Sequence, residues 1–544
     1  MAFKNLRFTV VAAFSSLLVI TSGCGTATTS NSAARPPAPI LDWGDQGDGT
    51  YRNPILKADY SDPDVIRVGD DFYLTGSDFH FVGMQILHSR DLVNWDLVGQ
   101  VFNRLTMNPR YDNLQGYAQG TWAPSLREHN GVFYIYVCTP NDGLFMWHAK
   151  NLAGPWSDTV TVVATNGWED PCPFWDDDGQ GYLVHSRTGA GPLILHKLSA
   201  DGTKLLDDGQ QIYRGNVAEG PKMFKRHGFY YISLPEGGVD TGGQVVLRST
   251  NIYGPYDRRQ VLQNGSPHQG GMVELNNGNA WFIAFKSTGF LGRVDHLIPV
   301  HWGDDDWPVF GDNGKTVDQF KKPDVGRDYP VARPQTSDEF AGRTLSPQWQ
   351  WNHNPSNADW SLTERPGWLR LKAIPPSTNA PGGRGGGGFG RGFPGSAASP
   401  LTMAHNTLTQ KIWGDTGTAD VKLDAGKMAN GQHAGFAFMS GRAFGWVGVQ
   451  QTNGVRHIAW NGGEGPEVPA DGNVWLRGTY ESSAAHLFYS LDGKSFTDTG
   501  ATVTLRFDQW KGARIAIYSY GDDGIADFDY VHYTYGKSRE NMSK

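Results

Sequence analysis

Residues 58–77 read ADYSDPDVIRVGDDFYLTGS, which is an apolar segment opened by a proline, then a tight turn and an aromatic strand. The same arrangement recurs in four later stretches, the last of which has glycines in place of the proline: APSLREHNGVFYIYV (123–137), DPCPFWDDDGQGYLVHS (170–186), GPKMFKRHGFYYISL (220–234) and HQGGMVELNNGNAWFIAF (268–285). A spacing of about fifty residues is typical of a propeller blade. Because one such unit cannot bury both of its faces alone, the repeat predicts an all-β fold with five sheets around a common axis.

The residues just before or at the start of each unit carry the chemistry: Asp62, Trp122, Asp170, Glu219 and His268. In a propeller, equivalent positions of the inner strands meet at one mouth, so we expect these side chains to converge. Aspartate in a turn-rich stretch is usually a turn residue, and this interpretation fits Asp70 and Asp71, which precede the aromatic strand. It does not fit the three carboxylates at the opposite end of the unit.

Length and composition limit the class of protein. A chain of 544 residues is too long for one ordinary core, and 70 glycines, 31 prolines and 19 tryptophans favour many short strands. The net charge of -8 is spread along the chain without a basic stripe, which argues against a nucleic-acid partner. Many aromatic side chains with modest charge suit a neutral polar ligand, and sugars are the commonest such ligands.

The N-terminus predicts export. Residues 1–23 form a signal peptide with basic Lys4 and Arg7 before an apolar run, and residues 24–45 form a linker. Ile-Thr-Ser-Gly-Cys resembles a bacterial lipobox, which implies that Cys24 is lipidated and that the protein is a periplasmic or cell-surface lipoprotein of a bacterium. Thr21 stands where such boxes usually have leucine, so a soluble secreted protein and an uncleaved anchor stay open as alternatives.

Two carboxylates that flank a glycosidic bond suffice for hydrolysis: one protonates the leaving oxygen and the other activates water or attacks the anomeric carbon. A third carboxylate can assist, because a neighbouring negative charge raises the pKa of a carboxyl group and keeps it protonated. Asp170 suits this role beside Glu219, and Asp62 is the candidate for the other side of the bond.

Residues from about 50 to 335 resemble glycoside hydrolase family 43, whose five-bladed propellers include β-xylosidases and α-L-arabinofuranosidases. The matching pieces are YSDPDVIRVGDDFYLTGSDFHF, GTWAPSLREHNGVFYIYV, EDPCPFWDDDGQGYLVHS, EGPKMFKRHGFYYISL and LGRVDHLIPVHW. The resemblance implies a single-displacement inverting mechanism with Asp62 as general base, Glu219 as general acid and Asp170 as the modulator that orients the acid. Inverting enzymes hold base and acid roughly 6.5–9.5 Å apart to leave room for water.

The same resemblance implies further contacts. Phe79 and Trp122 would form apolar walls for the terminal sugar, Arg293 would bond its hydroxyls, and no cofactor would be needed for the chemistry. His268 would line the central channel and contact a calcium or sodium ion, mainly through water. From the residues alone, Phe79 could be core, Arg293 a surface ion-pair partner and His268 a structural histidine.

The propeller pattern spans residues 46–335, and alternating strands continue over residues 336–540. Alternation with turn signals predicts a β-sandwich, which resembles the jelly-roll, concanavalin A-like C-terminal domain of family 43 xylosidases. In such enzymes a loop of this domain often reaches the propeller mouth, but the sequence does not identify that loop. A free-standing sugar-binding module is the alternative, and the insert at 380–396 is a flexible glycine-rich loop by composition.

These observations predict an exo-acting glycosidase that releases terminal β-D-xylose, α-L-arabinofuranose or both from hemicellulose-derived oligosaccharides, with a membrane link only through the lipid anchor. An endo-acting arabinanase, which needs an open cleft, and a non-catalytic carbohydrate-binding propeller are the alternatives. Cys138 and Cys172 could pair, although two buried free thiols fit their strand positions better. The sequence does not predict the oligomeric state.

Overall fold

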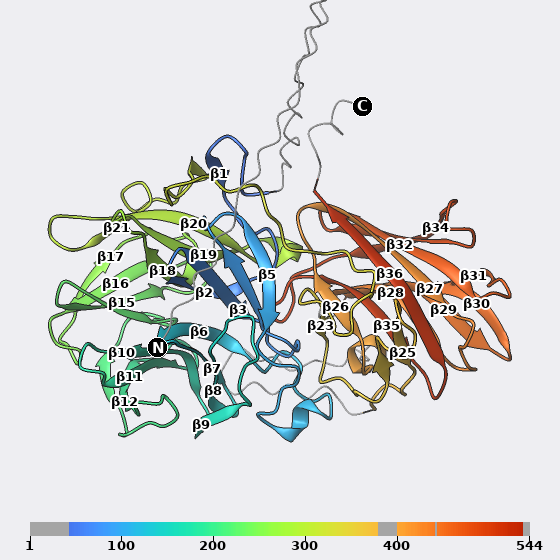
Figure 1. The fold of residues 1–544 in the computed structure, drawn as a ribbon, viewed down its shortest axis with the longest axis horizontal. Coiled ribbons are helices and arrows are strands. Elements are labelled where there is room, and N and C mark those ends of the chain that lie inside the picture. Colours follow the sequence, from blue (N-terminus) through green and yellow to red (C-terminus); the bar gives the residue numbers. More distant parts are fainter. Residues whose placement is uncertain (1–42, 379–399, 441–442, 537–544) are drawn as a thin grey trace, which may run out of the picture. The chain divides into compact units, whose positions relative to one another are not determined.

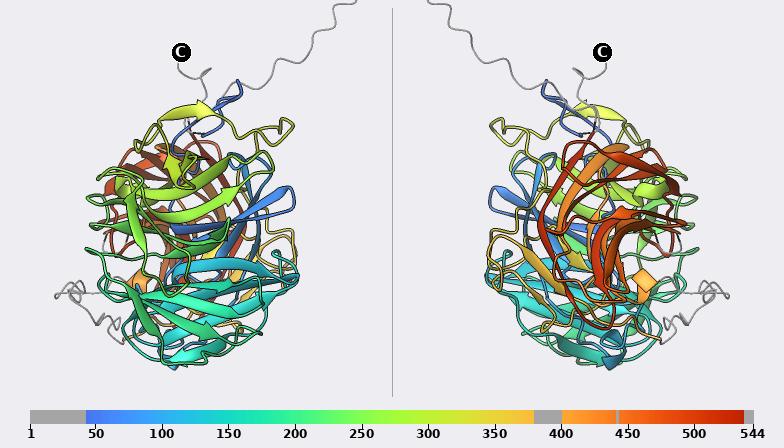
Figure 2. Two further views of the ribbon diagram at one scale, coloured as in Figure 1. Left: turned by 90° about the vertical axis from the view of Figure 1, so that its left-hand side faces the viewer. Right: turned by 90° about the vertical axis from the view of Figure 1, so that its right-hand side faces the viewer.

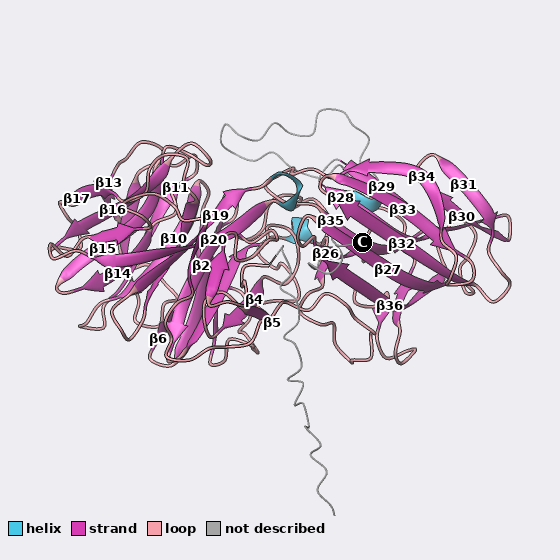
Figure 3. Cartoon of the chain, turned by 90° about the horizontal axis from the view of Figure 1, so that it is seen from above, coloured by secondary structure: helices cyan, strands magenta, loops and turns pink. Residues whose placement is uncertain are grey.

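The computed structural model describes residues 43–378, 400–440 and 443–536 (Figure 1). Strands dominate this part of the chain, and its helices are short 3-10 turns (Figure 3): η1 (Pro109–Tyr111), η2 (Gly289–Leu291) and η3 (Pro400–Met403). Among these residues no helix is long and apolar enough to cross a membrane. The predicted signal peptide, Cys24 and the glycine-rich insert 380–396 lie outside the described residues.

Five four-stranded sheets follow one another along the chain, and the predicted five-bladed β-propeller is confirmed. The left view of Figure 2 shows them succeeding one another around a centre, from blue through cyan and green to yellow-green. The first two blades are β2 (Ser61–Val68), β3 (Asp71–Ser77), β4 (Gln85–Ser89) and β5 (Trp95–Gln100), then β6 (Trp122–His129), β7 (Val132–Thr139), β8 (Gly143–Ala149) and β9 (Val160–Ala164).

The remaining blades repeat this order. The third is β10 (Trp168–Trp175), β11 (Gly181–Arg187), β12 (Leu193–Leu198) and β13 (Gln210–Tyr213). The fourth is β14 (Lys222–Arg226), β15 (Phe229–Glu236), β16 (Gly243–Ser249) and β17 (Asp257–Gln260). The fifth is β18 (His268–Glu274), β19 (Ala280–Ser287), β20 (Arg293–Trp302) and β21 (Pro308–Phe310). A separate pair, β1 (Thr50–Arg52) and β22 (Gln319–Lys321), joins the two ends of the propeller segment.

Every blade opens on the same backbone irregularity. Immediately before Pro63, Pro124, Pro171, Pro221 or Gly270, one residue adopts a left-handed conformation: Asp62 (φ 52°), Ala123 (φ 38°), Asp170 (φ 54°), Gly220 (φ 58°) and Gln269 (φ 45°). In four blades the pairing register of the first two strands shifts at this point. Such a β-bulge places two residues of one strand opposite one of its partner. It therefore brings two adjacent side chains of each blade to the rim of the propeller.

This bulge corrects part of the sequence interpretation. Asp62 and Asp170 occupy the left-handed position, whereas Glu219 stands one residue earlier in its blade, before Gly220. The three carboxylates therefore do not share one place in the repeat. In the third blade the residue that corresponds to Glu219 is Glu169, which the sequence analysis did not select.

The C-terminal part contains two seven-stranded antiparallel sheets, so the predicted β-sandwich is also confirmed (Figure 2, right). The first sheet has the order β23 (Gln350–Trp351), β26 (Leu408–Lys411), β35 (Arg514–Tyr520), β28 (His433–Ser440), β29 (Ala443–Thr452), β30 (Val455–Trp460) and β31 (Gly463–Glu467). The second has the order β24 (Trp360–Ser361), β25 (Leu369–Lys372), β36 (Ile525–Tyr535), β27 (Thr416–Asp424), β32 (Asn473–Glu481), β33 (Ala484–Ser490) and β34 (Thr497–Thr504).

Alternation of side chains builds the core of the sandwich. Along β27, Val421 and Leu423 are buried, whereas Asp420 and Lys422 between them are half-buried on the opposite face. Successive side chains of a strand point to opposite faces, so the pattern that predicted strands also sets which face enters the core.

In the described part of the chain, propeller and sandwich belong to one compact unit. The Lys411 ammonium of β26 lies 2.6 Å from the Asp78 carboxylate of the propeller, and neither side chain is more than 3% exposed. Burial raises the pKa of Asp78, but the charges of Lys411, Lys511 and Arg514 outweigh it and lower the value to about 2. Losing one member of such a buried group leaves an uncompensated charge, which opposes separation of the two parts and argues against a free-standing module.

The two cysteines of the propeller are buried and free, as the strand positions indicated. Cys172 Sγ accepts hydrogen bonds from the Arg127 guanidinium and from the backbone N–H of Met223, so its thiol is part of a contact between blades.

Candidate active site

Asp62 lies at the propeller mouth and is compensated by a cation. Its Oδ1 accepts a hydrogen bond from Arg293 at 2.9 Å, and its Oδ2 accepts hydroxyl protons from Ser77 at 2.6 Å and Ser61 at 3.0 Å. Both Asp62 and Arg293 are almost fully buried. Charge-assisted hydrogen bonds of this kind stabilise the negative charge of a carboxylate. The site thus holds one anionic oxygen pair with defined donors.

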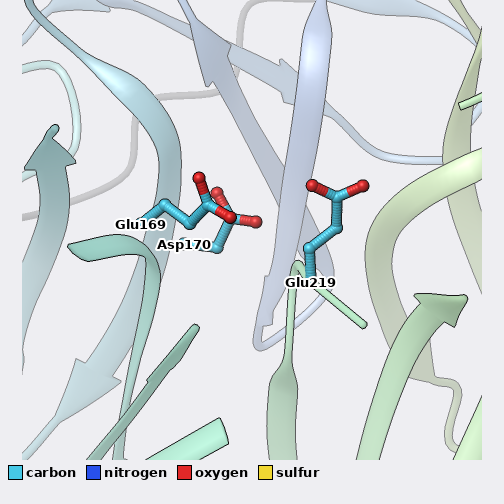
Figure 4. Close-up of side chains that lie close together, drawn as sticks. All are labelled: Glu169, Asp170 and Glu219. Carbon is cyan, nitrogen blue, oxygen red and sulfur yellow. The ribbon is translucent and has the colours of Figure 1, made fainter. Parts of the chain in front are cut away.

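A second group of carboxyl groups lies apart from that pair. Glu169, Asp170 and Glu219 each offer an oxygen within 4.8 Å of the others. Figure 4 shows Glu169 and Asp170 side by side, with their carboxyl groups turned toward Glu219. We call these three residues the carboxyl cluster. Within the described residues, none of the three forms an ion pair with a lysine or an arginine, so their charges lack a permanent cation.

Backbone donors hold the two inner members of the carboxyl cluster. Asp170 accepts the Gly220 N–H at 2.7 Å, and Glu169 accepts the N–H groups of Ala190 at 2.8 Å and Gly189 at 3.3 Å. Gly220 has no room for a side chain, because an added Cβ would lie 2.6 Å from the side chain of Gln269. The glycine therefore permits the close approach of the fourth and fifth blades at this point.

Burial and mutual repulsion raise the pKa values of Asp170 and Glu169. Burial first, and then the charges of Glu169, Glu219 and Asp62, raise the pKa of Asp170 well above its usual range. Burial, with Glu219 and Asp62, raises the pKa of Glu169 to about 7 against the effect of its two backbone donors. The Glu219 side chain is 21% exposed, whereas Glu169 and Asp170 are each 6% exposed. Glu219 is thus the member that a ligand in the mouth can reach.

Two aromatic residues border this mouth. The rings of Phe79 and Trp122 lie 5.4 Å apart between centroids, and the Lys511 ammonium lies 4.8 Å from the Phe79 ring centroid. Phe79 is 2% exposed, while Trp122 is half-buried. Trp122 therefore presents more surface to a ligand than Phe79 does.

His268 has a direct partner in the site. Its Nε2 lies 3.1 Å from Oε1 of Glu219, and its ring is 5.4 Å from that of Phe285. Calcium in proteins takes six to eight oxygen ligands. The one group of described acidic, histidine and cysteine residues close enough together to hold a metal ion is the carboxyl cluster, and it does not include His268. Because the predicted calcium or sodium ion would contact His268 mainly through water, a set of direct protein ligands does not test it, and it stays a prediction.

A loop of the sandwich completes the mouth. Between β34 and β35, Lys511 donates to the Ser77 carbonyl at 2.7 Å and pairs with Asp59 at 3.1 Å. The Trp510 ring lies 5.5 Å from the Arg293 guanidinium and is 36% exposed. The family resemblance implied that a sandwich loop often reaches the mouth, and the contacts of Lys511 and Trp510 make this loop the candidate. Nothing in the sequence of this loop indicates a site residue. Glu169, in contrast, could have been predicted from the sequence, because EDP and EGP place a glutamate at the same distance before a proline.

We expect Asp170→Asn to gain stability relative to wild type as pH rises. A carboxyl group whose pKa is raised by folding contributes stability that is complete below its unfolded value and is lost as pH rises toward its folded value. The variant lacks this loss, and the difference in unfolding free energy should grow by up to about 1.4 kcal/mol per pH unit. Asparagine tolerates the left-handed backbone of this position.

Thermal and denaturant unfolding between pH 3 and pH 8 will measure this difference. Asp176→Asn, at the opposite end of the same strand pair, is the matched control, because Lys225 and Tyr230 outweigh burial and lower the pKa of Asp176. Its stability deficit should therefore grow with pH. A difference for Asp170→Asn that stays constant over this range would contradict the raised pKa.

Comparisons with known proteins agree with this geometry. Family models match residues 51–308 as glycosyl hydrolases family 43 and residues 337–534 as the beta xylosidase C-terminal concanavalin A-like domain.

A putative beta-xylosidase of Xylanibacter ruminicola is 44% identical over 490 residues, 87% of each chain. The non-reducing end alpha-L-arabinofuranosidase BoGH43B of Bacteroides ovatus is 35% identical over 349 residues, 59% of this chain and 65% of that one. The solved structure of a Bacteroides ovatus xyloglucan-locus GH43B has a TM-score of 0.75 at 27% identity, covering 89% of this chain and 99% of that chain. The chain therefore belongs to glycosyl hydrolase family 43, and it is a glycosidase with the C-terminal domain of that family's β-xylosidases.

Proposed function

We propose that this glycosidase releases terminal β-D-xylose, α-L-arabinofuranose or both from hemicellulose-derived oligosaccharides by a single displacement with inversion. The observation that carries the proposal is the division of the site into two parts. Asp62 is matched by Arg293 and two hydroxyls, whereas the carboxyl cluster has no paired cation among the described residues and exposes Glu219 alone. Hydrolysis needs one carboxylate to take a proton and one carboxylic acid to give one.

In this mechanism Asp62 accepts a proton from the attacking water, whose oxygen bonds to the anomeric carbon. Glu219 gives its proton to the glycosidic oxygen as the bond between that oxygen and the anomeric carbon breaks. Asp170 lies behind Glu219 and orients the acid through the cluster. Arg293, whose Nε–H has no hydrogen-bond partner among the described residues, would bond a sugar hydroxyl beside the walls formed by Phe79 and Trp122.

The relatives point to both five-carbon sugars, since their names include β-xylosidases and an α-L-arabinofuranosidase. The sandwich loop at the mouth favours an exo-acting pocket over the open cleft of an arabinanase. A non-catalytic sugar-binding propeller has no need for a cluster of uncompensated carboxyl groups. No cofactor enters the chemistry, and none of these steps depends on an ion at His268.

Activity on xylobiose, linear arabinan and the 4-nitrophenyl glycosides of β-D-xylose and α-L-arabinofuranose tests the proposal. We expect turnover of both aryl glycosides and xylobiose but not of arabinan. Asp62→Asn should lose about 10²- to 10⁴-fold in kcat on every substrate. Glu219→Gln should lose as much on xylobiose and less on the nitrophenyl glycosides, because nitrophenolate leaves without full protonation.

The outcome can contradict each part separately. Binding of xylobiose without turnover by wild type would reject the catalytic hypothesis. A first-formed sugar of retained configuration, measured by proton NMR, would remove Asp62 from its role as base. Equal losses of Glu219→Gln on all substrates would argue against its role as acid.

Trp510→Ala tests whether the sandwich loop contacts substrate. Because the indole is 36% exposed beside Arg293, its removal should raise KM for xylobiose about tenfold or more, at a cost of roughly 1.4 kcal/mol of binding, and leave the melting temperature close to that of wild type. Leu206→Ala, an exposed apolar side chain of the propeller at 58%, is the control. An unchanged KM in Trp510→Ala would place this loop outside the substrate site.

We also propose, from the sequence alone, that the chain is an exported bacterial lipoprotein anchored through Cys24. Radiolabelled palmitate should enter the wild-type protein and not Cys24→Ala. Equal labelling of the two proteins, or none in wild type, would reject the anchor and leave a soluble secreted protein.

A further inference from the structure

We propose that Glu169 is a positioning residue of the acid step: together with Asp170 it keeps protons beside Glu219, and its titration sets where activity falls at alkaline pH. The proposal rests on the proposed role of Glu219 as general acid. The proposal gives a role in the reaction to Glu169, which the mechanism proposed above does not use.

The fold makes Glu169 the counterpart of Glu219. Both residues stand immediately before the left-handed residue of a blade, Asp170 in one case and Gly220 in the other. The third and fourth blades are neighbours, and the Gly220 N–H donates to Asp170 across their boundary at 2.7 Å. The two glutamates therefore enter the mouth from equivalent places and bring their carboxyl oxygens within 4.8 Å of each other and of Asp170 (Figure 4).

The surroundings of Glu169 suit a group that gains and loses a proton. Its carboxyl group is held by the N–H groups of Gly189 and Ala190, in the loop between β11 and β12, and no lysine or arginine pairs with it in the described part of the chain. The titratable groups that face it are Asp170 on its own strand, Glu219 before β14, Asp62 on β2 and the thiol of Cys138 on β7. None of these groups contributes a positive charge, so an ionised Glu169 makes loss of the last proton from the cluster harder.

Solvent exposure determines which carboxyl group of the cluster can donate a proton to the substrate. Glu169 and Asp170 are each 6% exposed, and only Glu219, with 21% of its side chain exposed, can meet a glycosidic oxygen. The two inner groups therefore lie behind one outer acid, and burial raises the pKa of both. A lysine or arginine paired with the cluster would draw this proton off, and the described residues place none there.

The pH dependence of kcat/KM on xylobiose between pH 4 and pH 9 tests the proposal with Glu169→Gln. Glutamine keeps an acceptor for the Ala190 N–H but carries no titrating group. We expect the alkaline limb of the profile to move about one to two pH units lower, as expected for removal of a like charge at this distance. At a fixed pH above the limb, kcat/KM should fall about tenfold for each pH unit by which the limb moves. Near pH 5, kcat should stay within about threefold of the wild-type value, because this pH lies below the pKa of Glu169, which burial raises to about 7, so Glu169 carries little charge there.

Glu169→Asp should return the limb part of the way toward wild type, and Asp176→Asn, at the other end of the same strand pair, should leave it unmoved. A uniform loss at every pH with an unmoved limb would show a merely structural role and overturn the proposal. Activity of Glu219→Gln on xylobiose equal to wild type would refute the proposed acid instead, whatever Glu169→Gln does.

If Glu169→Gln does not fold, infrared titration of the wild-type protein with ¹³C-labelled glutamate tests whether Glu169 holds a proton. We expect a protonated glutamic acid carbonyl band that moves with the label and disappears around pH 7, in line with the pKa of Glu169 raised by burial to about 7. Absence of such a band at pH 6 would overturn the proposal.

Discussion

The structure of this site depends on one backbone feature, the left-handed residue at the start of each inner strand. L-residues avoid that conformation at a cost of about 1–2 kcal/mol each, and such strain persists only where the surrounding structure holds it. Here it recurs in all five blades, at Asp62, Ala123, Asp170, Gly220 and Gln269. The bulge brings two neighbouring side chains of each blade to the same rim, so every blade can supply a pair of side chains to one mouth. Aspartate and glycine tolerate the conformation best, which explains their presence at Asp62, Asp170 and Gly220.

The carboxyl groups at this rim differ in whether a cation is paired with them. Asp62 has Arg293 and two hydroxyl donors, whereas Glu169, Asp170 and Glu219 have backbone N–H groups, a histidine and one another. A pair of titratable groups in different environments can serve as base and acid in the same pH range, because each environment stabilises a different protonation state. In this enzyme the difference comes from placing the arginine of the fifth blade beside the first blade, while the described residues bring no paired cation to the carboxyl cluster between the third and fourth blades.

The sandwich is connected to the candidate active site by hydrogen bonds. Lys511 bonds the carbonyl of Ser77, and the hydroxyl of Ser77 bonds Asp62, so two hydrogen bonds connect the second domain to the candidate base. Lys411 and Asp78 form a buried ion pair between the two parts. Breaking such a pair costs free energy, because each charge alone would be buried without a partner. The candidate active site therefore has contacts from both parts of the chain, although all three candidate catalytic carboxylates come from the propeller.

The fold class, the number of blades, the sandwich and the candidate residues Asp62, Asp170 and Glu219 could all be predicted from the sequence. These features follow from local rules: strand alternation, turn residues and a unit repeated at constant spacing. The correspondence of Glu219 with Glu169 is visible in EDP and EGP, but only the structure showed that both residues stand before the left-handed residue of a blade, because spacing alone does not reveal a bulge. Tertiary structure also decided the positions of Trp510 and Lys511, which lie more than four hundred residues from the start of the first blade and reach the site through packing between the two parts. The charge balance of each carboxyl group was likewise set by partners from other blades, since hydrogen bonds and desolvation depend on neighbours in space.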